Sequence, residues 1–408
     1  MPEVIFPLRR EYSREEQTVT KSIFTARRAL SVGVLAAVGV LGMAGGATVS
    51  EAAQSSESSV KVIAHGLNNP RGIEFNNGAV YVAEAGKGGS ECFGQGGGPE
   101  GQACYGKTGA VIRIEDGKQV RVIKGLPSVA GEDGAFATGP HDVSFSGSGE
   151  QQKLFVTVGE GPRKLTGDRR FSRLLRVKES GGTTKVADLL AYERENNPDD
   201  GADPFSGDPE LNSNPYSTVT LPNGGHVVAD AGGNSLIKVK PGGGLRTRAV
   251  FPTRPVENPE EFGLPPGFRY QSVPDALAAG PDGELYVGEL TGFPFPKGEA
   301  RVYRLKPGSK KPKVYAEGFT NIIDVAVGPD GSVYVLEFVK KGLLQAEGPD
   351  GDPSGRLVRI HPNGKRRVVA DGDQGLTFPA GVTIGPKGAA YVSNFGVFPE
   401  RGKVLRIK

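Results

Sequence analysis

Carboxylate and amide side chains recur at one position of a repeated pattern, at the end of a short segment rich in valine and aromatic residues. The residues at this position are Glu84, Asp230, Glu289, Glu337 and Asn394. Clustered oxygen atoms of this kind bind hard cations, which makes calcium the candidate cofactor. The other role is to cap backbone amides where a strand ends, which is the more ordinary role of acids at such a position. The sequence leaves both roles open.

A second set of polar residues begins the segment that precedes each of these. It comprises Arg71, His141, Tyr216 and Asp275, followed by Ile323 and Ala380 in the last two units, with Asp142 and Asp324 one residue further on. The four strongest candidates for a shared cation or polar-ligand site are Asp275, Asp324, Glu289 and Glu337. They come from adjacent units, and like charges held together resist ionisation unless a positive charge lies between them. Arg71 could supply that charge, and then no metal is needed.

The repeated pattern is plainest in residues 280–289, GPDGELYVGE, and 328–337, GPDGSVYVLE. Six units align on this phrase, each with an alternating apolar run, a glycine-containing turn, the valine-containing segment and a further apolar run. Such alternation predicts short antiparallel strands. The repetition predicts an all-β fold, a six-bladed β-propeller of four-stranded blades over residues 60–408.

The two ends of the repeated region complement each other. The sixth unit stops after its third strand, whereas residues 60–67, VKVIAHGL, precede the first unit without a sheet of their own. We therefore expect this N-terminal strand to complete the last blade and leave no unpaired edge. Val60, Val62 and Leu67 are expected to face the core.

Strand direction sorts the connections between strands into two faces. The long connections are 86–109, 161–171, 192–215, 251–274, 291–300, 340–355 and 395–402. All of them belong to the face where the first strand of each blade starts, here called the long-loop face. The other connections are tight turns and define the tight-turn face. Long loops gathered at one end of a rigid scaffold predict the binding face.

Two segments carry a resemblance to known families. NPRGIEF…AVYVAEAG and PNGGHVVADAGGNSLIKV are similar to the NHL-type repeat, in which Pro-x-Gly opens the inner strand and an acidic residue ends the second. Across residues 60–408, the order of units and the cysteine-bearing loop resemble the ScyD/ScyE family of exported propellers, named for scytonemin-biosynthesis gene clusters. That resemblance implies export and a propeller fold, and it implies no established activity.

Two enzymatic alternatives are compatible with a propeller. Lactonases of the gluconolactonase type hold a divalent metal with acidic and amide residues at the strand starts, but only Asp275 matches, since Ile323 and Ala380 supply no ligand. Quinone-dependent sugar dehydrogenases need a base, for which His141 is the one suitably placed histidine. The sequence contains no Gly-x-Ser-x-Gly elbow, phosphate loop or His-Glu-x-x-His motif. A binding or scaffolding protein is therefore the favoured class.

The first 52 residues have the parts of an export signal. Arg27 and Arg28 precede an uncharged apolar stretch that ends in small residues, as in secretory signal peptides. Cleavage after Ala52 would leave a polar linker, 53–59, with Ala47 as a competing site; an uncleaved anchor and the twin-arginine route stay open. We expect a secreted or extracytoplasmic monomer.

Charge bears on the partners. The 49 basic residues nearly balance the 46 acidic ones, so no global field attracts nucleic acid. The expected partners are a small polar ligand or an extracellular protein.

The chain has only two cysteines, Cys92 and Cys104, both in the glycine-rich loop of the first unit. Oxidising compartments favour disulfides. We therefore expect these two residues to be bonded to each other.

Overall fold

A computed structural model of the chain describes residues 60–94, 102–201, 211–346 and 351–408. The predicted export signal, 1–52, and the linker, 53–59, lie outside the described residues. Among the helices in the described ranges, none combines the length and the apolar character needed to cross a bilayer.

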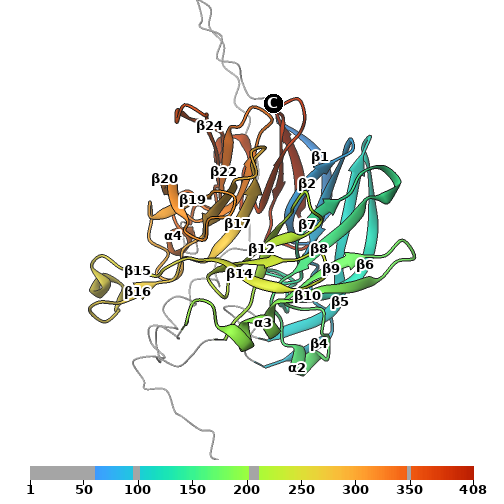
Figure 1. Ribbon diagram of the computed structural model, residues 1–408, viewed down its shortest axis with the longest axis horizontal. Coiled ribbons are helices and arrows are strands. Elements are labelled where there is room, and N and C mark those ends of the chain that lie inside the picture. Colours follow the sequence, from blue (N-terminus) through green and yellow to red (C-terminus); the bar gives the residue numbers. More distant parts are fainter. Residues whose placement is uncertain (1–59, 95–101, 202–210, 347–350) are drawn as a thin grey trace, which may run out of the picture. The chain divides into compact units, whose positions relative to one another are not determined.

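The described residues form the predicted ring of antiparallel blades (Figure 1). Blade one contains β2 (Pro70–Asn76), β3 (Ala79–Glu84), β5 (Ala103–Glu115) and β6 (Lys118–Gly131), with the short strand β4 (Glu91–Phe93) paired to β5. Blade two contains β7 (Pro140–Ser146), β8 (Lys153–Val158), β9 (Arg173–Val177) and β10 (Thr183–Asp188). Blade three contains β11 (Pro215–Thr220), β12 (His226–Asp230), β13 (Ser235–Val239) and β14 (Leu245–Val250).

The second half of the ring repeats this order. Blade four contains β17 (Pro274–Ala279), β18 (Leu285–Glu289), β19 (Ala300–Leu305) and β20 (Lys313–Phe319). Blade five contains β21 (Ile322–Val327), β22 (Val333–Glu337), β23 (Arg356–Ile360) and β24 (Arg366–Asp371). Blade six contains β25 (Gly381–Ile384), β26 (Ala390–Asn394), β27 (Gly402–Ile407) and β1 (Val60–Leu67). The prediction of a six-bladed β-propeller is confirmed.

The remaining elements are short insertions. They are the two-stranded ribbon of β15 (Arg254–Pro255) and β16 (Arg269–Tyr270), the helices α2 (Arg163–Thr166), α3 (Leu189–Asn196) and α4 (Leu343–Ala346), and the 3-10 turns η2 (Gly149–Gln151), η3 (Pro259–Phe262) and η4 (Gly372–Gln374).

The N-terminal strand closes the ring as predicted. β1 pairs antiparallel with β27, with Val60 opposite Ile407 and Leu67 opposite Gly402, and Figure 1 shows blue β1 beside the red C-terminal strands. The expected facing of Val62 is wrong, because its exposed fraction is 47%. Bulges between Val62 and Ala64 and between His65 and Leu67 shift the alternation, so that Ala64 and Leu67 are buried instead.

The Gly-Pro-Asp-Gly sequences of blades four and five form the same turn. In the fourth blade, Gly280 N donates to Glu284 O at 2.8 Å, and the Asp282 carboxylate accepts from Glu284 N at 3.1 Å. Gly283 has a φ of +76°, a left-handed conformation that glycine adopts without steric cost. The fifth blade repeats the geometry, with Gly328 N donating to Ser332 O at 2.8 Å. Each turn connects the first strand of its blade to the second.

Cys92 and Cys104 are bonded as predicted. They lie opposite each other on β4 and β5 and form a disulfide. Cys104 is buried, so the bond attaches the base of the glycine-rich loop to blade one.

Candidate functional site

Four of the five polar residues that end the second strands, all except Glu289, accept hydrogen bonds from backbone amides of their own blades. Oε1 of Glu84 accepts a hydrogen bond from Asn68 N at 2.7 Å, and Oε1 of Glu337 accepts one from Thr320 N at 2.7 Å. In both blades the donor amide belongs to the chain that enters the first strand.

Asp230 and Asn394 make the equivalent contacts. Asp230 accepts from Asn214 N at 2.7 Å and from Ser213 Oγ at 2.7 Å. Asn394 accepts from Thr377 N at 2.8 Å through its side-chain oxygen. This recurring arrangement is the geometry of a cap.

Arginine residues pair with three of the carboxylates that end the second strands. Arg121 forms a two-pronged pair with Glu84, with both N···O distances at 3.0 Å. Arg356 pairs in the same way with Glu337, whereas Arg254 contacts Glu289 through Nη2 alone. Ser272 Oγ also donates to Glu289 at 2.6 Å, while burial raises the pKa of this carboxyl.

The four residues expected to share one cation do not form one cluster. Glu337 is occupied by Thr320 and Arg356, whereas Asp275 interacts with Asp324 and Glu289. Within the described ranges, no three His, Cys, Asp or Glu side chains are placed to hold a metal ion. Calcium binding stays a prediction.

The first strands bring four polar side chains to one level of the ring. Arg71, His141, Tyr216 and Asp275 occupy the second position of β2, β7, β11 and β17, and we call them the polar arc. The Tyr216 ring packs on His141 with centroids 4.5 Å apart, and Arg71 Nη1 approaches the Tyr216 hydroxyl at 3.5 Å. Ile323 and Ala380, both buried, complete the level with apolar groups.

Several polar atoms of the arc are buried without a well-aligned hydrogen-bond partner in the described structure. They are Arg71 Nε, His141 Nδ1 and both carboxylate oxygens of Asp275. The exposed fractions of these residues are 9%, 4% and 1%. The Pro215 backbone interacts only weakly with His141, and the amides of Asp275 and Ala276 only weakly with the Asp275 carboxyl. A buried polar group without a partner lowers the stability of the folded state by about 1–3 kcal/mol. These polar side chains therefore do not stabilise the fold.

Burial sets the protonation of the arc. It lowers the pKa of His141 to about 3, with a further contribution from Arg71, and it raises the pKa of Tyr216 to about 12. Burial and the charges of Asp324 and Glu289 raise the pKa of Asp275 well above its usual range. At neutral pH, His141 is therefore a neutral donor and acceptor. It is a weak base, and Arg71 is the fixed charge of the arc.

Asp142 and Asp324 lie one residue further along their strands and join neighbouring blades. Asp142 accepts hydrogen bonds from Thr218 N at 2.7 Å and Ser217 Oγ at 3.1 Å, both in blade three. Asp324 accepts from Val382 N of blade six at 2.7 Å. Gly72 leaves room for this arrangement, since a Cβ there would come within 2.3 Å of Asp142 Oδ1.

A cavity of about 290 Å³ lies along the central channel beside these carboxylates. It is lined by the first strands of all six blades and contains Glu74, Asp142 and Asp324. The strand starts at the long-loop end are mostly buried, whereas Phe75, Phe145 and Ala279 at the other end are partly or fully exposed. The cavity therefore opens toward the tight-turn face, where loop length predicted no site.

Glu74 was missed by the sequence analysis. It is a charged residue inside GIEF, an otherwise apolar alternating strand, and that contrast could have identified it. Arg71 and Tyr216 were recognised as members of the ring but not as site residues.

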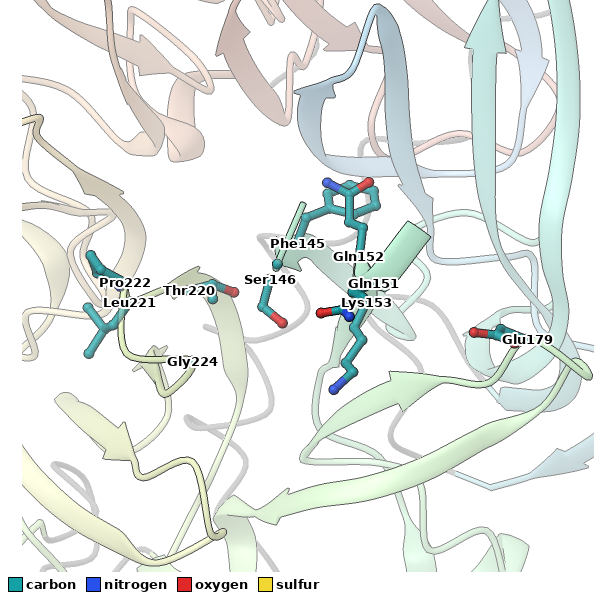
Figure 2. Close-up of a pocket in the computed structure, with 11 residues that line it drawn as sticks. Phe145, Ser146, Gln151, Gln152, Lys153, Glu179, Thr220, Leu221, Pro222 and Gly224 are labelled. Carbon is teal, nitrogen blue, oxygen red and sulfur yellow. The ribbon is translucent and has the colours of Figure 1, made fainter. Parts of the chain in front are cut away.

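A separate groove of about 780 Å³ runs between blades two and three on the tight-turn face. Figure 2 shows Lys153 and Ser146 between the turn from Thr220 to Gly224 and the more distant Glu179. Its lining mixes one lysine and one glutamate with neutral residues, so it has no strong preference for either sign of charge.

Comparison with known proteins finds similarity at the level of solved structures. No protein-family model and no curated protein matches the chain. The chain is similar to a solved structure described as a putative gluconolactonase, with 13% identity over 86% of this chain and 93% of that one and a TM-score of 0.45. It is also similar to a putative glucose dehydrogenase from Thermus thermophilus, with 15% identity over 86% of this chain and all of that one and a TM-score of 0.48. A third similar structure is virginiamycin B lyase from Staphylococcus aureus, with 12% identity over 86% of this chain and 99% of that one and a TM-score of 0.43. No activity of those proteins follows for this chain.

Proposed function

We propose that this chain is an exported propeller of the ScyD/ScyE type that binds a small polar ligand at the polar arc, on the long-loop side of the central channel. The observation that carries the proposal is the set of buried polar atoms without a well-aligned partner on Arg71, His141 and Asp275. Buried polar groups in folded proteins nearly always have partners. A ligand with both donors and acceptors would satisfy all of them.

The composition of the arc suggests the character of that ligand. Arg71 offers a cationic donor, and neutral His141 offers a donor and an acceptor. Asp275 adds a carboxyl group whose raised pKa favours a neutral, hydrogen-bonding form. The apolar residues Ile323 and Ala380 complete the ring, so a ligand with one hydroxyl- or carbonyl-rich edge and one apolar edge fits best.

Export is part of the same proposal. Its basis is the predicted signal in residues 1–52 together with the disulfide between Cys92 and Cys104, which is stable in an oxidising compartment. N-terminal sequencing of the mature protein tests it. The expected first residue is Ala53, and a retained Met1 would contradict cleavage.

The ligand proposal is tested by releasing small molecules from protein purified from its native source and identifying them by mass spectrometry. His141→Gln and Asp275→Ala should lose the ligand, whereas His226→Gln should retain it. His226 is a matched control because it is also a buried histidine but packs on Phe155 outside the arc. Equal retention by all three folded variants, or no bound molecule in the wild type, would overturn the proposal. Chemical change of the released molecule would favour the enzymatic alternatives.

A further inference from the structure

The cavity at the tight-turn end of the channel has a one-sided charge. Its described lining contains the carboxylates of Glu74, Asp142 and Asp324 and no lysine, arginine or histidine. Hydroxyl groups and short aliphatic side chains form the rest of the wall, including Ser144, Thr220, Thr383, Leu277 and Ala278. The cavity is therefore acidic, lined elsewhere by hydroxyl, aliphatic and aromatic side chains, and open at one end.

The carboxylates in the cavity are not equally occupied. Asp142 and Asp324 each use both oxygens to accept backbone amides, from Val143 and Thr218 and from Val325 and Val382. The backbone of Glu74 pairs with Tyr81 of β3, but its side chain makes no hydrogen bond or ion pair within the described part of the chain. Burial and the charge of Asp142 raise the pKa of Glu74 to about 8.

Asp275 belongs to the polar arc and is not among the residues that line this cavity. It is 1% exposed, and both of its carboxylate oxygens lack a well-aligned hydrogen-bond partner in the described structure. Its pKa is raised in part by the charge of Asp324, so the two carboxyl groups interact electrostatically. A buried acceptor without a donor indicates that the donor comes from a ligand or from solvent.

We propose that this cavity is a second binding site, which takes a small alkylammonium ion from the tight-turn face. The ammonium group donates to Glu74 and to the remaining lone pairs of Asp142 and Asp324, and the alkyl part packs on Leu277 and Ala278. The volume of about 290 Å³ admits a short diamine, whose two ammonium groups share these three carboxylates.

An ammonium ion fits this wall better than a directly bound metal. The described side chains offer no set of three acidic, histidine or cysteine groups placed to hold a metal ion. The two aspartates are fixed by backbone amides and cannot rotate to converge on one cation. An ammonium ion instead offers three separate N–H donors, which reach acceptors spaced around a cavity.

The test uses 1,4-diaminobutane as the probe in isothermal titration calorimetry at pH 7, in a buffer without amines. The neutral isostere 1,4-butanediol should not bind. Glu74→Gln should weaken diamine binding by about 30-fold or more, the effect of removing one member of a buried charged hydrogen bond. The matched control is Glu179→Gln, which removes an exposed carboxylate from the same face, in the groove of Figure 2, and should bind normally.

A second variant keeps the test independent of the folding of Glu74→Gln. Ala279 is exposed at the mouth of the cavity, and Ala279→Lys places a competing ammonium group there. It should also weaken the diamine. Binding releases protons if carboxyl groups ionise on contact with the ligand, so pH-stat titration of unbuffered protein should record proton release at pH 7 in the wild type and less in Glu74→Gln.

Three results would overturn the proposal. They are equal affinity for the diol, unchanged diamine affinity in both variants, and displacement of the diamine by equimolar magnesium. None of them bears on the polar arc, whose ligand is tested through His141 and Asp275.

Discussion

The carboxylate of Asp142 in blade two accepts a hydrogen bond from the backbone amide of Thr218 in blade three at 2.7 Å. Asp324 makes the same contact with Val382, from blade five to blade six, also at 2.7 Å. These contacts occur on the innermost strands, where adjacent blades approach most closely. Acidic residues that sequence reasoning assigned to ligand binding thus also join the ring.

Removal of either aspartate should destabilise the propeller. Asp142→Ala or Asp324→Ala leaves a backbone amide of the next blade without its acceptor, which costs about 1–3 kcal/mol. Urea denaturation followed by circular dichroism measures the change. Ser217→Ala is the control, because it removes the weaker 3.1 Å contact to Asp142 and a 3.4 Å contact to the Leu277 carbonyl but leaves the Thr218 amide bonded to Asp142. A loss below about 0.5 kcal/mol in both aspartate variants, within the range of ordinary surface changes, would contradict the role.

The seam between β1 and β27 should depend on Leu67 and not on Val62. Leu67 is 1% exposed and Val62 is 47% exposed. Leu67→Ala should lower the free energy of unfolding by about 2–5 kcal/mol, as expected for a large-to-small change in a core. Val62→Ala should change it by about 0.5 kcal/mol or less. Equal effects would show that β1 contributes through its backbone pairing alone.

The disulfide should matter little for the propeller as a whole. A bond between residues 12 apart stabilises by about 3 kcal/mol at most on chain-entropy reasoning, and most of that orders the glycine-rich loop. The double variant Cys92→Ser/Cys104→Ser should keep its circular dichroism spectrum and melt only a few degrees lower, while peptide mapping without reductant should show the linked pair in the wild type. Failure of the double variant to fold would assign the bond a larger role.

Stability should depend on pH through Glu74. Its pKa is raised from 4.5 to about 8 in the folded protein, so the folded state binds the proton more tightly than the unfolded state. The stability contributed by this proton is fully present below about pH 4.5 and is lost as the pH rises to about 8. The difference in unfolding free energy between wild type and Glu74→Gln should therefore fall across that window, in a buffer without amines. A difference that is flat with pH would contradict the raised pKa.

The fold was predictable because local chemistry repeats. The alternating apolar pattern and the glycine turns, such as those at Gly283 and Gly331, predict each blade from its local sequence. The number of units then predicts a closed ring of six blades. The prediction that Val62 faces the core was wrong because a β-bulge changes which side chains face inward. The alternation of apolar and polar residues in the sequence does not reveal a bulge.

The candidate site was predictable only in part. Asp275 and His141 were found because they occupy equivalent positions in successive units. Glu337 was expected in the same site, but its partner Arg356 on the adjacent strand already occupies it. The open end of the channel could not be inferred from loop length, because openness depends on how the side chains at the two ends of the inner strands pack.

A high-resolution crystal structure of the protein purified from its native source tests the central claim most directly. We expect an ordered non-protein molecule at the polar arc, with polar atoms within about 3.2 Å of the Asp275 carboxylate and of His141 Nδ1. If only fully occupied water molecules contact the Asp275 carboxylate and His141 Nδ1, the proposal of a ligand at the polar arc is contradicted.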